Sequence, residues 1–384
     1  MEIFARLTAL KLSPSRASLV VHLVSQDLSI AGKRAGLAGE RSGLFMEMIR
    51  VIKEMRDATN GEYPKFAIWE NVPGAFSSNG GEDFRAVLEE LARVEQPDAS
   101  IPRPSRGVRW SKAGAIAGNG WSLAWRQLDA QYWGVPQRRK RIALVADFGG
   151  QRAAEILFER TGVSGHLDES IKAWETTPGH SQASSSRCDR TGERVVYDAR
   201  GNGNGRTCPT ITGDHENRIT DYTAIAVEHA GCLTPWDVQS RRIFSEYGKW
   251  PALYSGEGGG HGYVFTLRWI VRRLTPMECE RLQGYPDGWT DIGEWVDTKG
   301  KKHKPADSPR YKALGNSIAL PQWYWIAQKM KPFIGENATL GSLFDGIGGF
   351  PLVFESTYGE GTAIWASEVD SFCIAVTKKH FPEY

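Results

Sequence analysis

A glycine-rich turn near the carboxyl end carries the strongest chemical signal in the sequence. The segment LGSLFDGIGGFPLVFE (340–355) has an apolar run, then a turn, then the start of a helical pattern. Glycines let a backbone turn tightly and approach a ligand closely. The helix N-terminus that follows offers free N–H groups and the positive end of its dipole. Alone, the turn also fits an ordinary connection between a strand and a helix.

A carboxylate after the next apolar run is a second candidate ligand-binding group beside that turn. Glu368 follows the run in TAIWASEVD (362–370), which we interpret as a strand. An acidic side chain at the end of a second strand commonly binds ribose hydroxyls. Together, the turn and Glu368 predict a cofactor that contains adenosine. Glu368 alone would equally fit an exposed carboxylate at a strand end.

Apolar periodicity elsewhere predicts an α/β protein. Helical spacing occurs at 43–56, 84–94, 275–284 and 320–331, and short apolar runs predict strands at 65–72 and 141–148. Between 177 and 262 the chain is rich in Gly, Ser, Thr, Asn and Asp. Its short β-like runs, VVYDA and YTAIAV, indicate a loop-rich, partly β region.

Motifs along most of the chain resemble those of the DNA cytosine-5 methyltransferases. FDGIGGF (344–350) and WASEVD (365–370) resemble the two cofactor motifs of that family, and WENVPG (69–74) is similar to its Glu-Asn-Val motif. Four further segments resemble other motifs of the family: QDLSIAGKRAGLAGERSGLF (26–45), VPQRRKRI (135–142), RRLTPMECERLQGYPDGW (272–289) and YKALGNSIALP (311–321).

The resemblance implies an α/β, Rossmann-like fold that depends on S-adenosylmethionine. The cofactor motif stands after GNSIA (315–319) instead of opening the chain, so we expect a circularly permuted order. Permutation is tolerated where the old termini lie close together at the surface. We expect the first part of the catalytic domain at 1–150, a smaller target-recognition domain at 151–270, and the second catalytic part at 271–384.

The resemblance also assigns roles to single residues. A cytosine would be flipped out of duplex DNA into the pocket. Glu70 would hold and protonate its N3, and Asn71 would orient that contact. Arg139 and Arg141 would position the nucleophile loop and the base. Cofactor contacts would come from Phe344, Asp345, Gly346, Gly348, Gly349, Phe350, Glu368, Val369, Asn316 and Ser317.

The position of the nucleophile departs from the family pattern. The family has Pro-Cys-Gln, and this chain has Val24-Ser25-Gln26. A serine hydroxyl is a far weaker nucleophile than a thiolate near neutral pH. With suitable codons, a one-base shift of residues 1–25 spells a peptide that contains Gly-Asp-Ile and ends in Gly-Gly-Ser-Pro-Cys-Gln. We therefore hypothesise a frameshifted segment, which the nucleotides across codons 1–30 would confirm or refute.

Composition places few limits on function. The 384 residues are 41% hydrophobic and 24% charged, so a sizeable core can form, and a net charge of +2 decides nothing about nucleic acid. Five cysteines without a CxxC pair predict no metal site and a reducing compartment. Without a membrane-length apolar run or a signal pattern, we expect a cytoplasmic monomer.

Alternatives remain open at this level. Ser25 favours a catalytically inactive DNA-binding homologue, and the same motifs would fit an RNA cytosine methyltransferase or, less well, another nucleotide-dependent enzyme. The expected partners are double-stranded DNA and, in a restriction-modification setting, a cognate endonuclease. Basic clusters at 138–141, 272–273 and 299–304 fit either a solvated face or a contact with nucleic acid.

Overall fold

The computed structural model describes residues 43–105, 108–158, 195–198, 223–228 and 269–382. The helices are α1 (Gly43–Ala58), η4 (Pro73–Gly81), α2 (Glu82–Ala92), η5 (Ala130–Tyr132), α3 (Ala153–Leu157), α6 (Pro276–Gln283), α7 (Asp307–Asn316), α8 (Pro321–Ile334), α9 (Gly349–Tyr358) and α10 (Ser371–His380). The strands are β1 (Phe66–Asn71), β2 (Ala113–Ala117), β3 (Ser122–Asp129), β4 (Lys140–Asp147), β5 (Val195–Asp198), β6 (Thr223–Glu228), β7 (Trp269–Arg273), β8 (Trp295–Val296), β9 (Lys302–His303), β10 (Leu340–Leu343) and β11 (Ala363–Ser367).

Two sheets form the middle layer of the body that holds most of the described helices. Four strands lie in the order β1-β4-β3-β2 with antiparallel neighbours, and β10 pairs with β11 in parallel. Parallel pairing requires a crossover connection, which α9 provides between β10 and β11. The mixed α/β class expected from the sequence is confirmed.

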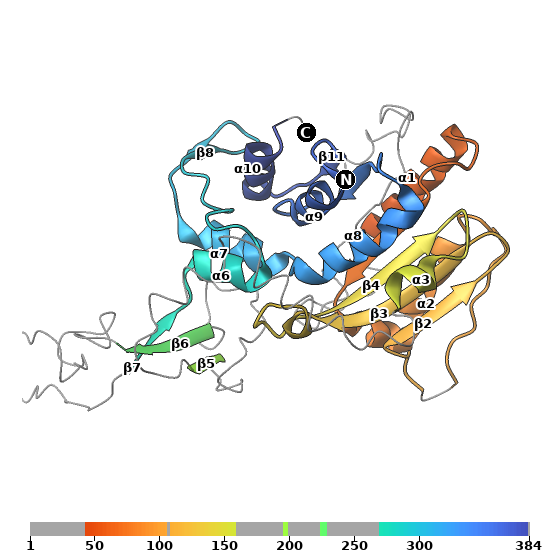
Figure 1. Ribbon diagram of the computed structural model, residues 1–384, viewed down its shortest axis with the longest axis horizontal. Helices are drawn as coiled ribbons and strands as arrows, with labels where there is room; N and C mark the ends of the chain where they lie inside the picture. Colours follow the sequence, from red (N-terminus) through yellow and green to blue (C-terminus); the bar gives the residue numbers. More distant parts are fainter. Residues whose placement is uncertain (1–42, 106–107, 159–194, 199–222, 229–268, 383–384) are drawn as a thin grey trace, which may run out of the picture.

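Strand β1 is buried along its whole length because helices cover both of its faces. Successive side chains of a strand point to opposite faces, so Phe66 and Ile68 join one core and Ala67 and Trp69 join the other. The first core includes α3, α8, α9 and α10, and the second includes α1 and α2. Figure 1 shows these helices around the strands.

Strand β10 contributes to the same two cores. Leu340 lies in the core of α8 and α9, and Leu343 lies in the core that also holds Trp69 of β1. The carboxyl-terminal strand pair therefore belongs to the same layered body as the strand that carries Glu70.

The sequence-based elements outside the middle region are confirmed, with ends shifted by a few residues. α1, β1, α2, β4, α6, α8 and β11 all fall where periodicity predicts them, and β5 and β6 fall in the two β-like runs. Periodicity does not predict the β2–β3 hairpin or α7. The strands β5, β6 and β7 form a separate antiparallel sheet, apart from the other elements at the lower left of Figure 1.

Much of the expected recognition region, 151–270, lies outside the described residues. The domain limits and the permuted order therefore stay predictions. Among the described helices, none combines the length and apolar character that crossing a bilayer would require.

Phe84 offers a test of the core beneath the site. Its ring is fully buried and meets Phe76, Trp110 and Trp125 edge to face. Replacing Phe84 by Ala should lower the free energy of unfolding by about 3–5 kcal/mol, because a cavity replaces these contacts. Urea denaturation measures this change. Val296→Ala, at a 52% exposed position, should change it by less than about 0.5 kcal/mol; equal effects would contradict this packing.

Candidate active site

Glu70 is a buried carboxylate beside an arginine from the neighbouring strand. It lies near the end of β1 with 1% of its surface exposed, and its Oε1 is 2.8 Å from Nε of Arg141 on β4. Its Oε2 has no hydrogen-bond partner among the described residues. Burial raises the pKa of Glu70, while the charges of Arg141 and Arg139 oppose that rise. Such a carboxyl can keep a proton more readily than an exposed one.

Asn71 holds the backbone that leaves β1. Its Oδ1 accepts a hydrogen bond of 2.7 Å from the backbone N–H of Val72, and its buried Nδ2 has no partner within the described residues. The amide therefore caps the loop after the strand, and no described hydrogen bond joins it to Glu70. Its expected role in orienting Glu70 would act through that loop.

Arg139 links this strand layer to the end of α7. Its guanidinium is fully buried and donates to the backbone carbonyls of Gly315, at 2.8 Å, and Ser317. Burial lowers the pKa of Arg139 well below its ordinary value, with Arg141 adding to the effect and Glu70 opposing it. A buried guanidinium requires such acceptors because leaving water without them is costly. The nucleophile loop that Arg139 is expected to position lies mostly outside the described residues.

Ser317 connects α7 to the glycine turn through Tyr285. The two hydroxyls share a hydrogen bond, and a Cβ added at Gly349 would meet the Tyr285 hydroxyl at 2.5 Å. A glycine is required at position 349 because no side chain fits there. Contacts thus join Arg139 to Ser317, Ser317 to Tyr285 and Tyr285 to the turn, and the charge of Arg139 acts on Glu70. Asn316, also expected at the cofactor, has an exposed side chain.

The turn itself has the backbone geometry predicted for it. Phe344, Gly346 and Gly348 have φ values of 56°, 60° and 78°. A Cβ at Gly346 would meet nothing within 4 Å, so the backbone there borders open space. The Gly346 N–H donates at 2.7 Å to Oε2 of Glu368. The glycine turn and Glu368, which the sequence predicts to be neighbours, are therefore in contact. Val369, the next residue, is exposed.

Asp345 is a second buried carboxyl at the turn. Its Oδ1 accepts a hydrogen bond from Ser342, and its Oδ2 has no partner within the described residues. Burial raises its pKa to about 7; Ser342 opposes this shift and Glu368 adds to it. By contrast, Phe350 lies in the core against Trp323, with centroids 4.9 Å apart, so it supports the turn from inside.

Sequence reasoning missed the residues that hold the segment opposite the turn. Trp289 donates through Nε1 to the Ile347 carbonyl at 2.7 Å and stacks on His380. Buried Glu280 of α6 accepts from the backbone N–H groups of Gly288, at 2.7 Å, and Thr290, at 2.9 Å. The segment 272–289 resembles a family motif, but its spacing alone does not show which side chains face the turn.

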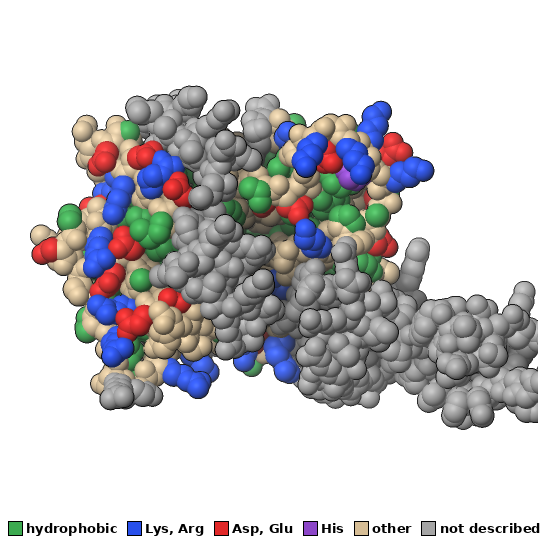
Figure 2. All heavy atoms as spheres, turned by 180° about the vertical axis from the view of Figure 1, so that it is seen from behind, with side chains coloured by type: hydrophobic (Ala, Val, Ile, Leu, Met, Phe, Trp, Pro, Cys, Tyr) green, Lys and Arg blue, Asp and Glu red, His purple; other side chains and the backbone are tan. Residues whose placement is uncertain are grey.

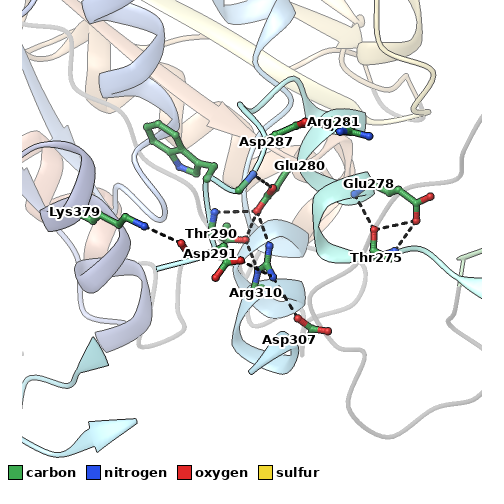
Figure 3. Close-up of polar contacts among 12 residues, drawn as sticks. Thr275, Glu278, Glu280, Arg281, Asp287, Thr290, Asp291, Asp307, Arg310 and Lys379 are labelled. Atoms are coloured by element: carbon green, nitrogen blue, oxygen red, sulfur yellow. Dashed lines mark hydrogen bonds and ion pairs between the residues drawn. The ribbon is translucent and has the colours of Figure 1, made fainter. Parts of the chain in front are cut away.

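Arg310 of α7 completes this polar network (Figure 3). Its guanidinium lies 3.2 Å from Oε1 of Glu280 and 3.0 Å from Oγ1 of Thr290. At the N-terminus of α6, Thr275 and Glu278 form a capping box. The network therefore holds α6, α7 and the segment after α6 together, with Tyr285 and Trp289 against the glycine turn.

Ser25, the position of the expected nucleophile, lies outside the described residues. Glu70, Asn71, Arg139 and Arg141 are brought together, as are Ser317, the turn and Glu368. The arrangement combines, in one layered body, a protonatable carboxyl and a glycine turn whose backbone borders open space at Gly346.

Comparisons with known proteins agree with the motifs. The model of the C-5 cytosine-specific DNA methylase family matches residues 25–95 and 113–332. The chain is 28% identical over 390 residues to a DNA N-6-adenine-methyltransferase of Escherichia phage P1, covering 79% of this chain and 51% of that protein. It is 23% identical over 323 residues to the type II methyltransferase M.HhaI of Haemophilus parahaemolyticus. That alignment covers 83% of this chain and 76% of that protein.

The chain spans about half the length of the phage P1 relative and 62% of the type II methyltransferase M1.ScrFI of Lactococcus lactis. Among solved structures, the S. pombe Dnmt2 methyltransferase aligns with a TM-score of 0.42 at 16% identity, covering 86% of this chain and 83% of that one.

Asp345 should make stability depend on pH. Its pKa is about 7 when folded, against an ordinary 3.8, so the stabilisation by its proton is complete below about pH 4 and is lost as the pH rises through 7. Asp345→Asn should remove this loss and raise the free energy of unfolding at pH 8, relative to wild type, by roughly 2–4 kcal/mol. Urea denaturation at pH 5 and pH 8 tests it. Asp98→Asn, at an exposed position, should show the same change in the free energy of unfolding between pH 5 and pH 8 as wild type. The same change in wild type and both variants would refute the raised pKa of Asp345.

Two arginines drawn in Figure 3 form a matched pair for testing the network. Arg310 faces fully buried Glu280, whereas Arg281 faces the partly exposed Asp287. Arg310→Met should lower the free energy of unfolding by about 3 kcal/mol, because Glu280 stays buried without its cation. Arg281→Met should cost less than about 1 kcal/mol. Thermal or urea unfolding compares them, and a reversed order would contradict the proposed importance of Arg310.

Proposed function

Because the chain belongs to the C-5 cytosine-specific DNA methylase family, we propose that it is a DNA cytosine-5 methyltransferase using S-adenosylmethionine. The observation that carries this proposal is the buried, partly unpartnered carboxyl of Glu70 in the same layered body as the glycine turn. The substrate is cytosine in duplex DNA, flipped from its stack because its C5 is otherwise out of reach.

Glu70 has the properties of a group that grips the flipped base. Its raised pKa lets it carry a proton, and the ion pair with Arg141 fixes Oε1, which leaves Oε2 to face the N3 edge of cytosine. A hydrogen bond or proton given to N3 withdraws electrons from the ring and favours attack at C6. Asn71 holds the backbone that directly follows this carboxyl.

The residues of the turn fit the cofactor. Open space borders Gly346, where the backbone has positive φ, and Glu368 stands beside it at the end of β11. Glu368 would hold the ribose hydroxyls, and Gly346 would allow close approach of the amino-acid part. S-adenosylmethionine, when bound, supplies the electrophilic methyl group. Asp345 adds a buried oxygen that has no hydrogen-bond partner among the described residues at the same turn.

A circularly permuted order is part of the proposal. The cofactor turn follows α8 in the chain, yet β10 shares both cores with β1. Residues 335–339 would then join what are separate ends in the common arrangement. The packing of Leu340 and Leu343 supports this order because it places the late strand beside elements from the first half of the chain.

The name of the phage P1 relative gives adenine N6 as that protein's target. In this chain, the buried glutamate and the family match favour cytosine C5. The second candidate function, a DNA-binding homologue without methyl transfer, is favoured by one observation: Ser25 stands where the family has its nucleophilic cysteine.

The two candidates can be separated by restoring the nucleophile. The chain as written and a Val24→Pro, Ser25→Cys variant are incubated with duplex DNA and S-adenosylmethionine, and the digested nucleosides are analysed by mass spectrometry. We expect little or no product from the first and 5-methyldeoxycytidine from the second, because a thiolate replaces a weak nucleophile. Adding Glu70→Gln to the active variant should lower the rate by at least about 100-fold.

Other outcomes are equally informative. Methyl transfer to adenine N6 would overturn the cytosine assignment. Absence of product from both proteins, with DNA binding retained, would support the inactive homologue. An undiminished rate with Glu70→Gln would remove Glu70 from the mechanism and leave the family assignment intact.

A further inference from the structure

The hairpin of β8 and β9 carries a dense group of lysines. Lys299, Lys301, Lys302 and Lys304 are all exposed. Within the described part of the chain, no carboxylate forms an ion pair with any of them. Two acids close to the hairpin in the chain, Asp291 and Asp307, both lie within 4 Å of Arg310. The hairpin, defined here as residues 295–304, therefore presents positive charge to the surface.

The backbone of this hairpin is held in one shape. Oδ1 of Asp297 accepts hydrogen bonds of 2.9 Å from the N–H groups of Lys299 and Lys301. Its Oδ2 lies 2.8 Å from Nε2 of His303, and these bonds lower the pKa of Asp297 to about 2. Trp295 stacks on the His303 ring with centroids 4.3 Å apart. The lysines are thus attached to an ordered support.

The hairpin lies at the edge of the molecule where the parallel strands end. Oγ1 of Thr298 is 3.0 Å from Oγ of Ser371, the first residue of α10, and Trp295 meets Phe372 edge to face. Ser371 follows β11 and Glu368 in the chain. In α/β sheets, ligands bind outside the carboxyl ends of the strands. Figure 2 shows basic side chains at the end of the molecule that carries β8 and α10, at its upper right.

We propose that hairpin 295–304 is an interaction surface for the phosphate backbone of duplex DNA. The inference rests on the proposed DNA substrate and adds a contact surface to it. Ammonium groups spread along a hairpin match a polyanion with regularly spaced charges better than a single small ligand. Lysine–phosphate contacts release counterions and position the duplex without reading its sequence.

The experiment measures how DNA binding depends on salt. The full chain is titrated against a fluorescent duplex at several KCl concentrations, and the slope of log K against log salt is obtained by anisotropy. The test variant carries Lys→Gln at 299, 301, 302 and 304. The control carries the same four-charge change at Lys53, Lys65, Lys112 and Lys329, which lie on or next to α1, β1, β2 and α8, away from β8 (Figure 1).

The test variant should show a shallower slope, by about 0.9 for each phosphate that a lysine no longer neutralises and so by up to about 3.6. The control should keep the wild-type slope. Equal slopes for wild type and test variant, equal changes in test and control, or no DNA binding by the full chain would each overturn the proposal. Binding without methyl transfer would leave this inference standing and count against the proposed activity alone.

Discussion

The buried guanidinium of Arg139 is the constraint on which the arrangement of the site depends. A cation at this depth is tolerated only where acceptors replace its water. Here the carbonyls of Gly315 and Ser317 accept hydrogen bonds from the Arg139 guanidinium. The loop before β4 must therefore lie against the end of α7. Ser317 in turn contacts Tyr285, and Tyr285 leaves no room for a side chain at Gly349. One buried charge thereby relates the strand of Glu70 to the glycine turn.

The two buried carboxyls, Glu70 and Asp345, have different surroundings. Glu70 has two arginines nearby, which oppose the effect of burial on its pKa. Asp345 has a hydroxyl and the like charge of Glu368. The first carboxyl is held in place by the cation of Arg141, and its Oε2 has no hydrogen-bond partner among the described residues. Burial raises the pKa of the second carboxyl to about 7, and this carboxyl belongs to the turn.

A ligand site of this kind needs support from outside its contacting residues. The Glu280–Arg310 network fixes α6 against α7, and Trp289 donates to the carbonyl of Ile347 inside the turn. The hairpin 295–304 continues from the same segment and is joined to α10. The stretch between the two helices thus supports the turn on one side and carries exposed lysines on the other.

The sequence by itself determined the local elements and predicted which residues carry the chemistry. Strong periodicity located α1, β1, α2 and α8, and the motifs located Glu70, Arg139 and the turn. It did not locate β2, whose AGAIA run has small side chains, or α7, whose Pro309 and Gly315 are poor helix formers. α7 forms because tertiary contacts stabilise it, including the bond from Gln283 to the Leu314 carbonyl. Only the tertiary structure showed that Tyr285 lies against the turn and that Glu280 and Arg310 hold the segment containing it. Contacts between residues far apart in the chain depend on how the layers pack.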